Sequence, residues 1–168
     1  KKTKKIADFI AKSQKNGYWR DFPKTFNLTN FSAIYALSSL GYRKTLQKSI
    51  NWFRKNRAKD KIGWGMDNES EKSEYTFTSN VIIALILAGE EPLKRYLQRA
   101  RRFLEQGQQN GAWSSTKLTI TKPTTYATAV STLALILLSE NPFNQKIKAG
   151  INFLIKSQNK GWSLIEKG

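Results

Sequence analysis

Four tryptophans recur at a nearly constant interval, and this spacing constrains the fold more than any other feature of the chain. Trp19, Trp64, Trp113 and Trp162 are separated by 45, 49 and 49 residues, and each follows a glycine within two positions. A period of this length is typical of helical hairpins stacked side by side. The 168 residues are also few enough to form one domain. The sequence therefore predicts a single repeat domain over residues 1–168, made of about three and a half copies of one unit.

Two kinds of segment alternate between these tryptophans. The segments that precede each tryptophan are amphipathic, with apolar residues at spacings of three and four, as in Ile6, Phe9, Ile10 and Leu97, Ala100, Leu104. The segments between them, residues 28–40, 76–88 and 124–138, contain no charged residue. The first pattern indicates helices with one exposed face, and the second indicates buried helices. We therefore predict an all-α fold of about seven main helices, with basic outer helices and apolar inner ones.

Local signals also predict where the inner helices begin and end. Asn, Thr and Pro residues at their amino ends are candidate caps or first-turn residues, namely Asn27, Thr29, Asn30, Thr76, Thr78 and Pro123. Gly41 and Gly89 follow two of the uncharged segments, where glycine commonly ends a helix.

The segment from Arg99 to Trp113 reads Arg-Ala-x-x-Phe-Leu-x-x-x-Gln-x-x-Gly-x-Trp. This pattern resembles the QW motif of squalene and oxidosqualene cyclases. Copies ending at Trp19 and Trp162 repeat it with small departures, whereas the copy ending at Trp64 lacks the Gln. The resemblance implies an α/α-toroid of the terpenoid cyclase and protein prenyltransferase superfamily, in which the Gln stacks on the Trp and ties neighbouring turns together. The structural repeat residues are then Gln14, Trp19, Trp64, Gln108, Trp113, Gln158 and Trp162.

The resemblance also implies that the ring is incomplete. Toroids of this superfamily close with about six hairpins, whereas this chain supplies three hairpins and one further helix. An open array of this kind leaves apolar surface uncovered. We therefore expect the chain to work within an assembly, whose partner is the remainder of a longer chain, a second copy or another protein.

The residues that the chemistries of this superfamily require are absent from the sequence. The chain has no cysteine and no histidine, which excludes Cys/His zinc sites, thioester chemistry and an imidazole base. It also lacks the Asp-x-Asp-Asp motif of the cyclases. The nearest acidic run spans residues 67–74, and its weak catalytic candidates are Asp67, Glu69 and Glu74. We therefore expect a non-catalytic module that binds a protein partner, with no metal and no cofactor.

An enzyme that handles an isoprenoid or another apolar small molecule is the alternative. Aromatic residues on the inner helices could line its cavity, and the candidates are Tyr35, Tyr75, Phe77 and Tyr126. Aromatic side chains on apolar helices are more often ordinary core, so both interpretations stay open here.

A second alternative rests on charge. The chain has 29 Lys and Arg against 12 Asp and Glu, which gives a net charge of +17. Such a surface attracts nucleic acid or anionic membrane, although a solvated outer face gives the same pattern. The candidate anion-binding residues lie in two basic runs and are Arg54, Lys55, Arg57, Arg99, Arg101 and Arg102. No uncharged run is long enough to span a bilayer, so the expected location is the cytoplasm.

Overall fold

The computed structural model of the chain describes residues 2–20, 25–115, 122–139, 141 and 144–158. Within these residues it contains seven α-helices and no strand. The helices are α1 (Lys2–Ser13), α2 (Asn27–Ser38), α3 (Arg43–Lys55), α4 (Tyr75–Leu87), α5 (Arg95–Gly107), α6 (Thr125–Leu138) and α7 (Gln145–Gln158). The predicted all-α class is therefore confirmed.

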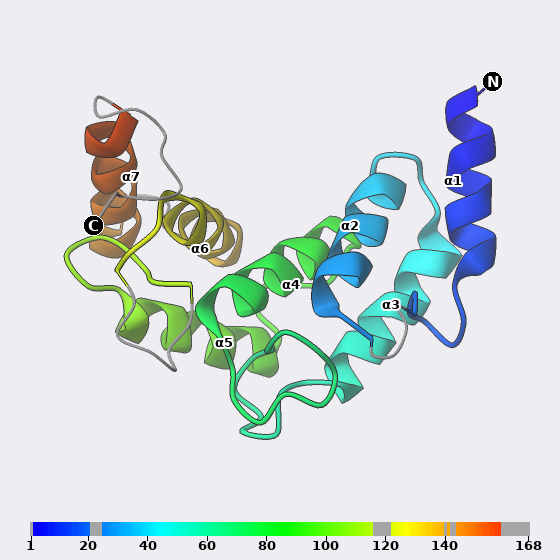
Figure 1. The fold of residues 1–168 in the computed structure, drawn as a ribbon, viewed down its shortest axis with the longest axis horizontal. Coiled ribbons are helices and arrows are strands. Elements are labelled where there is room, and N and C mark those ends of the chain that lie inside the picture. Colours follow the sequence, from blue (N-terminus) through cyan, green and yellow to red (C-terminus); the bar gives the residue numbers. More distant parts are fainter. Residues whose placement is uncertain (1, 21–24, 116–121, 140, 142–143, 159–168) are drawn as a thin grey trace.

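The helices form an array with an inner and an outer row. The uncharged helices pack in succession, α2 against α4 and α4 against α6. The amphipathic helices flank them: α1 and α3 pack on α2, α5 packs on α4 and α6, and α7 packs on α6. Figure 1 shows α1 at one end of the array and α7 at the other. The alternation of amphipathic and uncharged segments thus becomes a helical repeat, and its assignment to an α/α-toroid stays a prediction.

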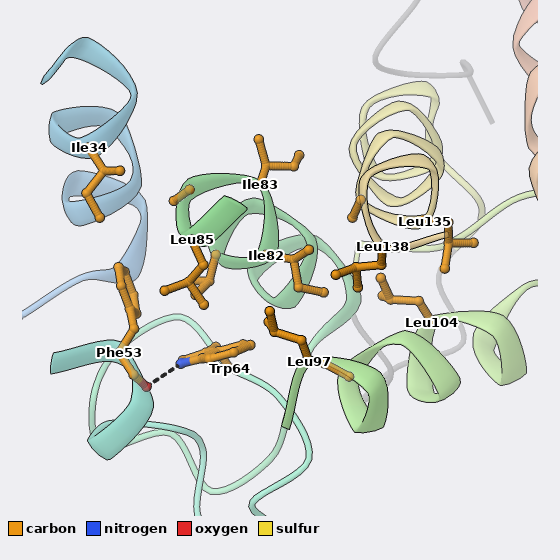
Figure 2. Close-up of a cluster of buried hydrophobic side chains, with 14 of the residues drawn as sticks. Ile34, Phe53, Trp64, Ile82, Ile83, Leu85, Leu97, Leu104, Leu135 and Leu138 are labelled. Atoms are coloured by element: carbon orange, nitrogen blue, oxygen red, sulfur yellow. Dashed lines mark hydrogen bonds between the residues drawn. The ribbon is translucent and has the colours of Figure 1, made fainter. Parts of the chain in front are cut away.

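The core runs along the array between the two rows. Figure 2 shows Phe53 and Leu97 from the outer helices next to Ile82 and Leu85 of α4. Ten of the thirteen residues of α4 are buried, because this helix has inner neighbours on both sides. Burial of large apolar side chains of this kind contributes about 1.5–3 kcal/mol each to the stability of the fold.

The described tryptophans of the repeat make the same hydrogen bond in each copy. The indole Nε1 of Trp19 donates to the carbonyl oxygen of Ile10 at 2.7 Å. The corresponding bonds join Trp64 to Phe53 at 3.0 Å and Trp113 to Leu104 at 2.8 Å. Each acceptor lies on an outer helix, near the end where backbone carbonyls lack a helical partner. Trp162 lies outside the described residues.

The backbone amides of these tryptophans are held by polar side chains of the inner helices. The acceptors are the Oδ1 of Asn30 for Trp19, the Oγ1 of Thr78 for Trp64 and the Oγ1 of Thr128 for Trp113. Asn30 and Thr78 are therefore not caps, and this part of the sequence prediction is wrong. They are buried because each one satisfies a loop amide that the core encloses.

The ends of the inner helices differ from the prediction in other ways. Helices α2 and α4 follow Phe26 and Glu74, which make no side-chain capping bond. The predicted candidates Asn27, Thr29 and Thr76 lie inside these helices. Helix α6 is capped by Thr124, whose side chain accepts from the amide of Ala127, so Pro123 lies just outside it.

The predicted glycines after α2 and α4 have positive φ, +77° at Gly41 and +96° at Gly89. Glycine adopts this conformation with no steric cost, as expected after the end of a helix. No helix in the described part of the chain is long and apolar enough to cross a membrane.

Candidate anion-binding cleft

The turn after an outer helix packs against the next outer helix, and we call this contact an outer joint. At the joint between α1 and α3, the amide Nε2 of Gln14 donates to the carbonyl oxygen of Thr45 at 3.0 Å and to the Oγ of Ser49 at 2.8 Å. At the joint between α5 and α7, Nε2 of Gln108 donates to the carbonyl oxygen of Lys146 at 2.8 Å. The described bonds of these Gln side chains thus tie one repeat to the next.

At each of these two joints, which we call closed joints, a glycine lies against the backbone of the next outer helix. Gly17 and Gly111 have φ of +93° and +85°. A Cβ atom on Gly111 would lie 2.6 Å from the carbonyl oxygen of Ala149, and one on Gly17 would collide with the carbonyl oxygen of Lys48. The turn therefore lies directly against the backbone of the next outer helix, with no room for a side chain between them.

The joint between α3 and α5 is built differently. The position four residues after the acceptor of the indole bond can be compared in the three copies. It is a glutamine in two of them, Gln14 after Ile10 and Gln108 after Leu104. It is an arginine, Arg57, after Phe53. The tryptophan follows its acceptor by nine residues in the other two copies and by eleven here. An arginine and a longer turn thus replace the glutamine and the short turn.

Arg57 reaches toward the next outer helix, as the two glutamines do. Its guanidinium carbon lies 5.9 Å from the centre of the Tyr96 ring, within the range of a cation–π contact. Tyr96 comes one residue before the buried Leu97, as Thr45 comes before Leu46. Tyr96 and Thr45 thus occupy the same repeat position. Arg57 contacts the aromatic ring of Tyr96, whereas Gln14 donates to the backbone carbonyl of Thr45.

This joint contains a cleft of about 580 Å³. Five cationic side chains and one tyrosine line it, from the end of α3, the turn after it and the start of α5: Arg54, Arg57, Lys94, Arg95, Tyr96 and Arg99. The turn before α5 and the first helical turns of α5 supply four of these residues.

An ion pair with a buried carboxylate lies in the wall of the cleft. The Nε and Nη2 atoms of Arg54 donate to the two carboxylate oxygens of Glu90 at 2.7 and 2.8 Å. Glu90 is only 6% exposed, and the hydroxyl of Tyr96 donates to it as well. The pKa of Tyr96 is raised well above its ordinary value, mainly by burial and to a lesser extent by the hydrogen bond to Glu90. The Tyr96 hydroxyl therefore stays protonated and remains a donor. These bonds fix the positions of Arg54 and Tyr96 in the cleft wall.

Two of the five cations have carboxylate partners. Glu90 balances Arg54, and Glu91 lies 2.9 Å from the Nζ of Lys94 at the exposed rim. Arg57, Arg95 and Arg99 make no ion pair with any carboxylate in the described ranges. The cleft therefore carries three positive charges that the described part of the protein leaves unbalanced, and such charges attract anions.

The structure brings together half of the predicted anion-binding residues. Arg54, Arg57 and Arg99 lie at the cleft. Arg101 is paired with Glu105 at 2.9 Å, and Arg102 is exposed elsewhere on α5. Lys55 lines a separate hollow with Lys48, Trp52 and two asparagines.

Sequence reasoning missed Lys94, Arg95 and Tyr96. Arg95 and Arg99 are four residues apart on one helix face, and this spacing was the available signal.

The predicted catalytic carboxylates belong to the long turn before α4. Asp67 is buried, and its Oδ1 accepts from the amide of Glu69 and the hydroxyl of Ser70. Glu69 itself is exposed, and Glu74 is the half-buried residue before α4. In the described ranges, no three His, Cys, Asp or Glu side chains come close enough together to hold a metal. The hydrogen bonds of Asp67 shape the turn.

The predicted ligand-binding aromatics occupy different environments. Tyr75 is buried and stacks on Phe103 with ring centres 4.8 Å apart. Tyr35 and Tyr126 are exposed, and the Tyr126 hydroxyl accepts from the Nδ2 of Asn80 at 3.2 Å. Phe77 is half-buried. Tyr75 is therefore part of the packed core.

No family model matches the chain, and no curated protein matches it. The resemblance to the terpenoid cyclase and prenyltransferase superfamily stays a prediction that rests on the QW-like residues.

Proposed function

We propose that the chain is a non-catalytic helical-repeat module of the α/α-toroid kind, which binds a protein partner at the ends of its array. The observation that carries this proposal is the exposure of large apolar side chains on the two end helices. Phe9 and Ile6 of α1 are 72% and 62% exposed, and Ile155 of α7 is 55% exposed. Side chains of this size cost free energy when water surrounds them, and a partner that covers them removes that cost.

The repeat register supports this interpretation at α1. Phe9 immediately precedes the indole acceptor Ile10, as Phe103 precedes Leu104. Phe103 is buried, because its helix α5 lies in the middle of the array and packs on both α4 and α6. A phenylalanine at the same repeat position is thus buried in the middle of the array, as Phe103, and exposed at its end, as Phe9. A partner that packs on α1 would bury Phe9 in the same way.

The other end of the array offers a similar surface. Ile151 of α7 is exposed, as are Leu133 and Ile136 of α6, the helix against which α7 packs. The partner can be the remainder of a longer chain, a second copy or another protein, since each of these would bury the same side chains.

The basic cleft favours a second candidate function, the binding of an anion. This function requires no catalytic group, and it uses a surface that the described end residues do not contribute to. The two functions are therefore compatible in one protein.

The proposal is tested with the purified chain, by sedimentation and by the fluorescence of an apolar dye. We expect either self-association or strong dye binding. Whichever is observed should decrease in the double variant Phe9→Glu, Ile155→Glu. Leu93→Glu is the matched control, because Leu93 is an exposed apolar residue that lies between α4 and α5, away from the ends. A monomer that binds no dye, or an equal effect of Leu93→Glu, would contradict the proposal.

A further inference from the structure

We propose that the cleft between α3 and α5 is a binding site for a phosphomonoester, with Arg57 and Arg99 directed at its phosphate group. The inference does not depend on the binding of a protein at the ends of the array. It rests on the placement of the guanidinium groups, on their charge balance and on the departure of this joint from the repeat.

Guanidinium groups come together from α3, the turn after it and α5. The Nη1 atoms of Arg57 and Arg99 both donate to the carbonyl oxygen of Lys61, at 3.1 and 3.4 Å. These two nitrogens are therefore at most about 6.5 Å apart, which is the sum of the two distances. The guanidinium carbon of Arg54 lies 6.0 Å from the centre of the Tyr96 ring, and that of Arg57 lies 5.9 Å from it.

Like charges at this separation repel each other, and the repulsion is stronger where protein replaces part of the surrounding water. Glu90 offsets only the charge of Arg54. The cleft thus holds positive charges that its own described residues leave unbalanced, and a bound anion would balance them.

The charge and shape of the cleft favour a phosphomonoester over other anions. A guanidinium presents paired donors that match phosphate oxygens, and a phosphomonoester carries about −1.5 to −2 near pH 7. That charge matches the unbalanced Arg57, Arg95 and Arg99 better than the single charge of a carboxylate or a phosphodiester. The cleft volume of about 580 Å³ also leaves room for an organic group attached to the phosphate.

A nucleic acid fits the cleft less well. Single-stranded nucleic acid is bound by a track of cations together with exposed aromatic rings on which bases stack. The cations here surround one hollow. Tyr96 is the one aromatic residue among the described lining residues, and it is half-buried with two guanidinium groups over its ring. The arrangement is suited to one compact anionic group.

The site coincides with a break in the repeat. The joints at Gln14 and Gln108 are closed by an amide hydrogen bond and by a glycine against a carbonyl oxygen. At the joint between α3 and α5, Arg57 takes the position of the glutamine, and the turn that leads to the tryptophan is two residues longer. A local departure from an otherwise regular pattern is expected at functional positions, where the pattern is given up for another purpose.

The experiment measures binding to the purified full chain by calorimetry at about 0.15 M salt, where surface attraction is largely screened. The probes are phenyl phosphate, its methyl diester, benzoate and a peptide that carries one phosphoserine. We expect saturable binding of phenyl phosphate with one site per chain, at least about tenfold tighter than that of the diester or benzoate. Tighter binding of the peptide would assign the ligand to phosphorylated proteins, and equal or weaker binding would assign it to small phosphomonoesters.

Variants then locate the site. Arg57→Gln and Arg99→Gln should each weaken phenyl phosphate binding about tenfold, since each removes a charge-assisted donor. Arg102→Gln is the matched control, because it removes the same charge from the exposed surface of α5 outside the cleft, and it should change binding less than about twofold. Arg99→Lys keeps the charge but loses the paired donors, so its binding should be intermediate between those of the unaltered chain and Arg99→Gln.

Circular dichroism melting shows whether each variant is folded. Arg99 is exposed, so its variants keep the test decisive if Arg57→Gln fails to fold. Three results would overturn the proposal: no saturable binding of phenyl phosphate up to about 10 mM, equal binding of monoester and diester, or an equal loss of affinity in Arg102→Gln and Arg99→Gln.

Discussion

The indole Nε1 of Trp64 donates a 3.0 Å hydrogen bond to the carbonyl oxygen of Phe53, at the end of the outer helix α3 (Figure 2). Both side chains are fully buried, and their rings meet edge to face with centres 6.3 Å apart. The bond satisfies one of the carbonyl groups that a helix leaves unpaired at its carboxyl end. The long turn after α3 is thereby fastened to the helix that precedes it.

Replacing Trp64 with phenylalanine should remove this bond and leave a small cavity. A buried carbonyl without a partner and a large-to-small change in the core together predict a loss of about 2–4 kcal/mol in the free energy of unfolding. Urea unfolding followed by circular dichroism measures the loss. Trp52→Phe is the control, because Trp52 is half-buried, and it should cost less than about 1.5 kcal/mol. Equal losses in the two variants would contradict a special role for the Trp64 bond.

Much of this fold follows from the sequence, because the period of the tryptophans and the absence of charge in the inner segments are local signals. The roles of Asn30 and Thr78 do not follow, because near the start of a helix these residue types usually act as caps. Here each binds the backbone amide of a tryptophan 11 or 14 residues earlier in the chain. Sequence periodicity does not indicate such partners, which depend on how the turn folds back on the inner helix.

The cleft could be predicted only in part, for a similar reason. Basic runs in the sequence identify cations, but helical geometry decides which of them share a surface. Arg99 and Arg101 are two residues apart on α5, so they point in different directions, and Arg101 instead pairs with Glu105 four residues later. Arg54 and Arg57 come together with Arg99 because α3 and α5 are successive outer helices, which is a tertiary relationship.

The glycines at the closed joints predict a strong dependence on residue size. Gly111→Ala should destabilise the chain by about 2–4 kcal/mol, because the new methyl group would collide with the carbonyl oxygen of Ala149 and φ is positive. Gly17→Ala should behave alike for the same reasons. Gly41→Ala is the control, since Gly41 also has positive φ but has open space around it, and it should cost only about 1–2 kcal/mol. Thermal unfolding of the three variants compares them directly, and a Gly41 effect as large as the others would contradict the proposed close contact.

The buried Glu90 predicts a contrast between two ion pairs. Glu90→Gln should lower the free energy of unfolding by about 2 kcal/mol, because Glu90 holds Arg54 through two charge-assisted bonds and also accepts from Tyr96. Glu71→Gln should leave it nearly unchanged, since the pair between Glu71 and Lys59 is exposed and solvent screens it. Chemical denaturation at constant pH measures both changes. If the two substitutions cost the same, the burial of the Glu90 carboxylate has no energetic consequence.

Stability should fall at alkaline pH. Burial raises the pKa of Tyr75, and burial together with the bond to Glu90 raises the pKa of Tyr96. A hydrogen bond to Asp8 raises the pKa of Tyr42. Because these pKa values are higher in the folded chain than in the unfolded chain, the folded state retains protons above pH 10 that the unfolded state has lost. The free energy of unfolding should therefore be unaffected by these groups below about pH 10 and should decrease above it.

Urea unfolding at a series of alkaline pH values tests this decrease, with tyrosinate absorbance as a direct record of ionisation. Tyr75→Phe should make the decrease shallower, because phenylalanine has no proton to lose and still packs on Phe103. An unchanged slope in this variant would show that Tyr75 ionises alike in the folded and unfolded chains.

The glutamines at the two closed joints should contribute unequally to stability. Gln14 makes two hydrogen bonds to α3, at the carbonyl oxygen of Thr45 and the Oγ of the fully buried Ser49. Gln108 makes one, to the carbonyl oxygen of Lys146 at an exposed position. Gln14→Ala should therefore cost about 1–2 kcal/mol, because it leaves the Ser49 hydroxyl without this partner, and Gln108→Ala should cost less than about 1 kcal/mol, because water can replace the bond. Denaturant unfolding of the two variants measures this difference, and a larger loss in Gln108→Ala would mean that hydrogen bonding to the next outer helix is not how these glutamines stabilise the array.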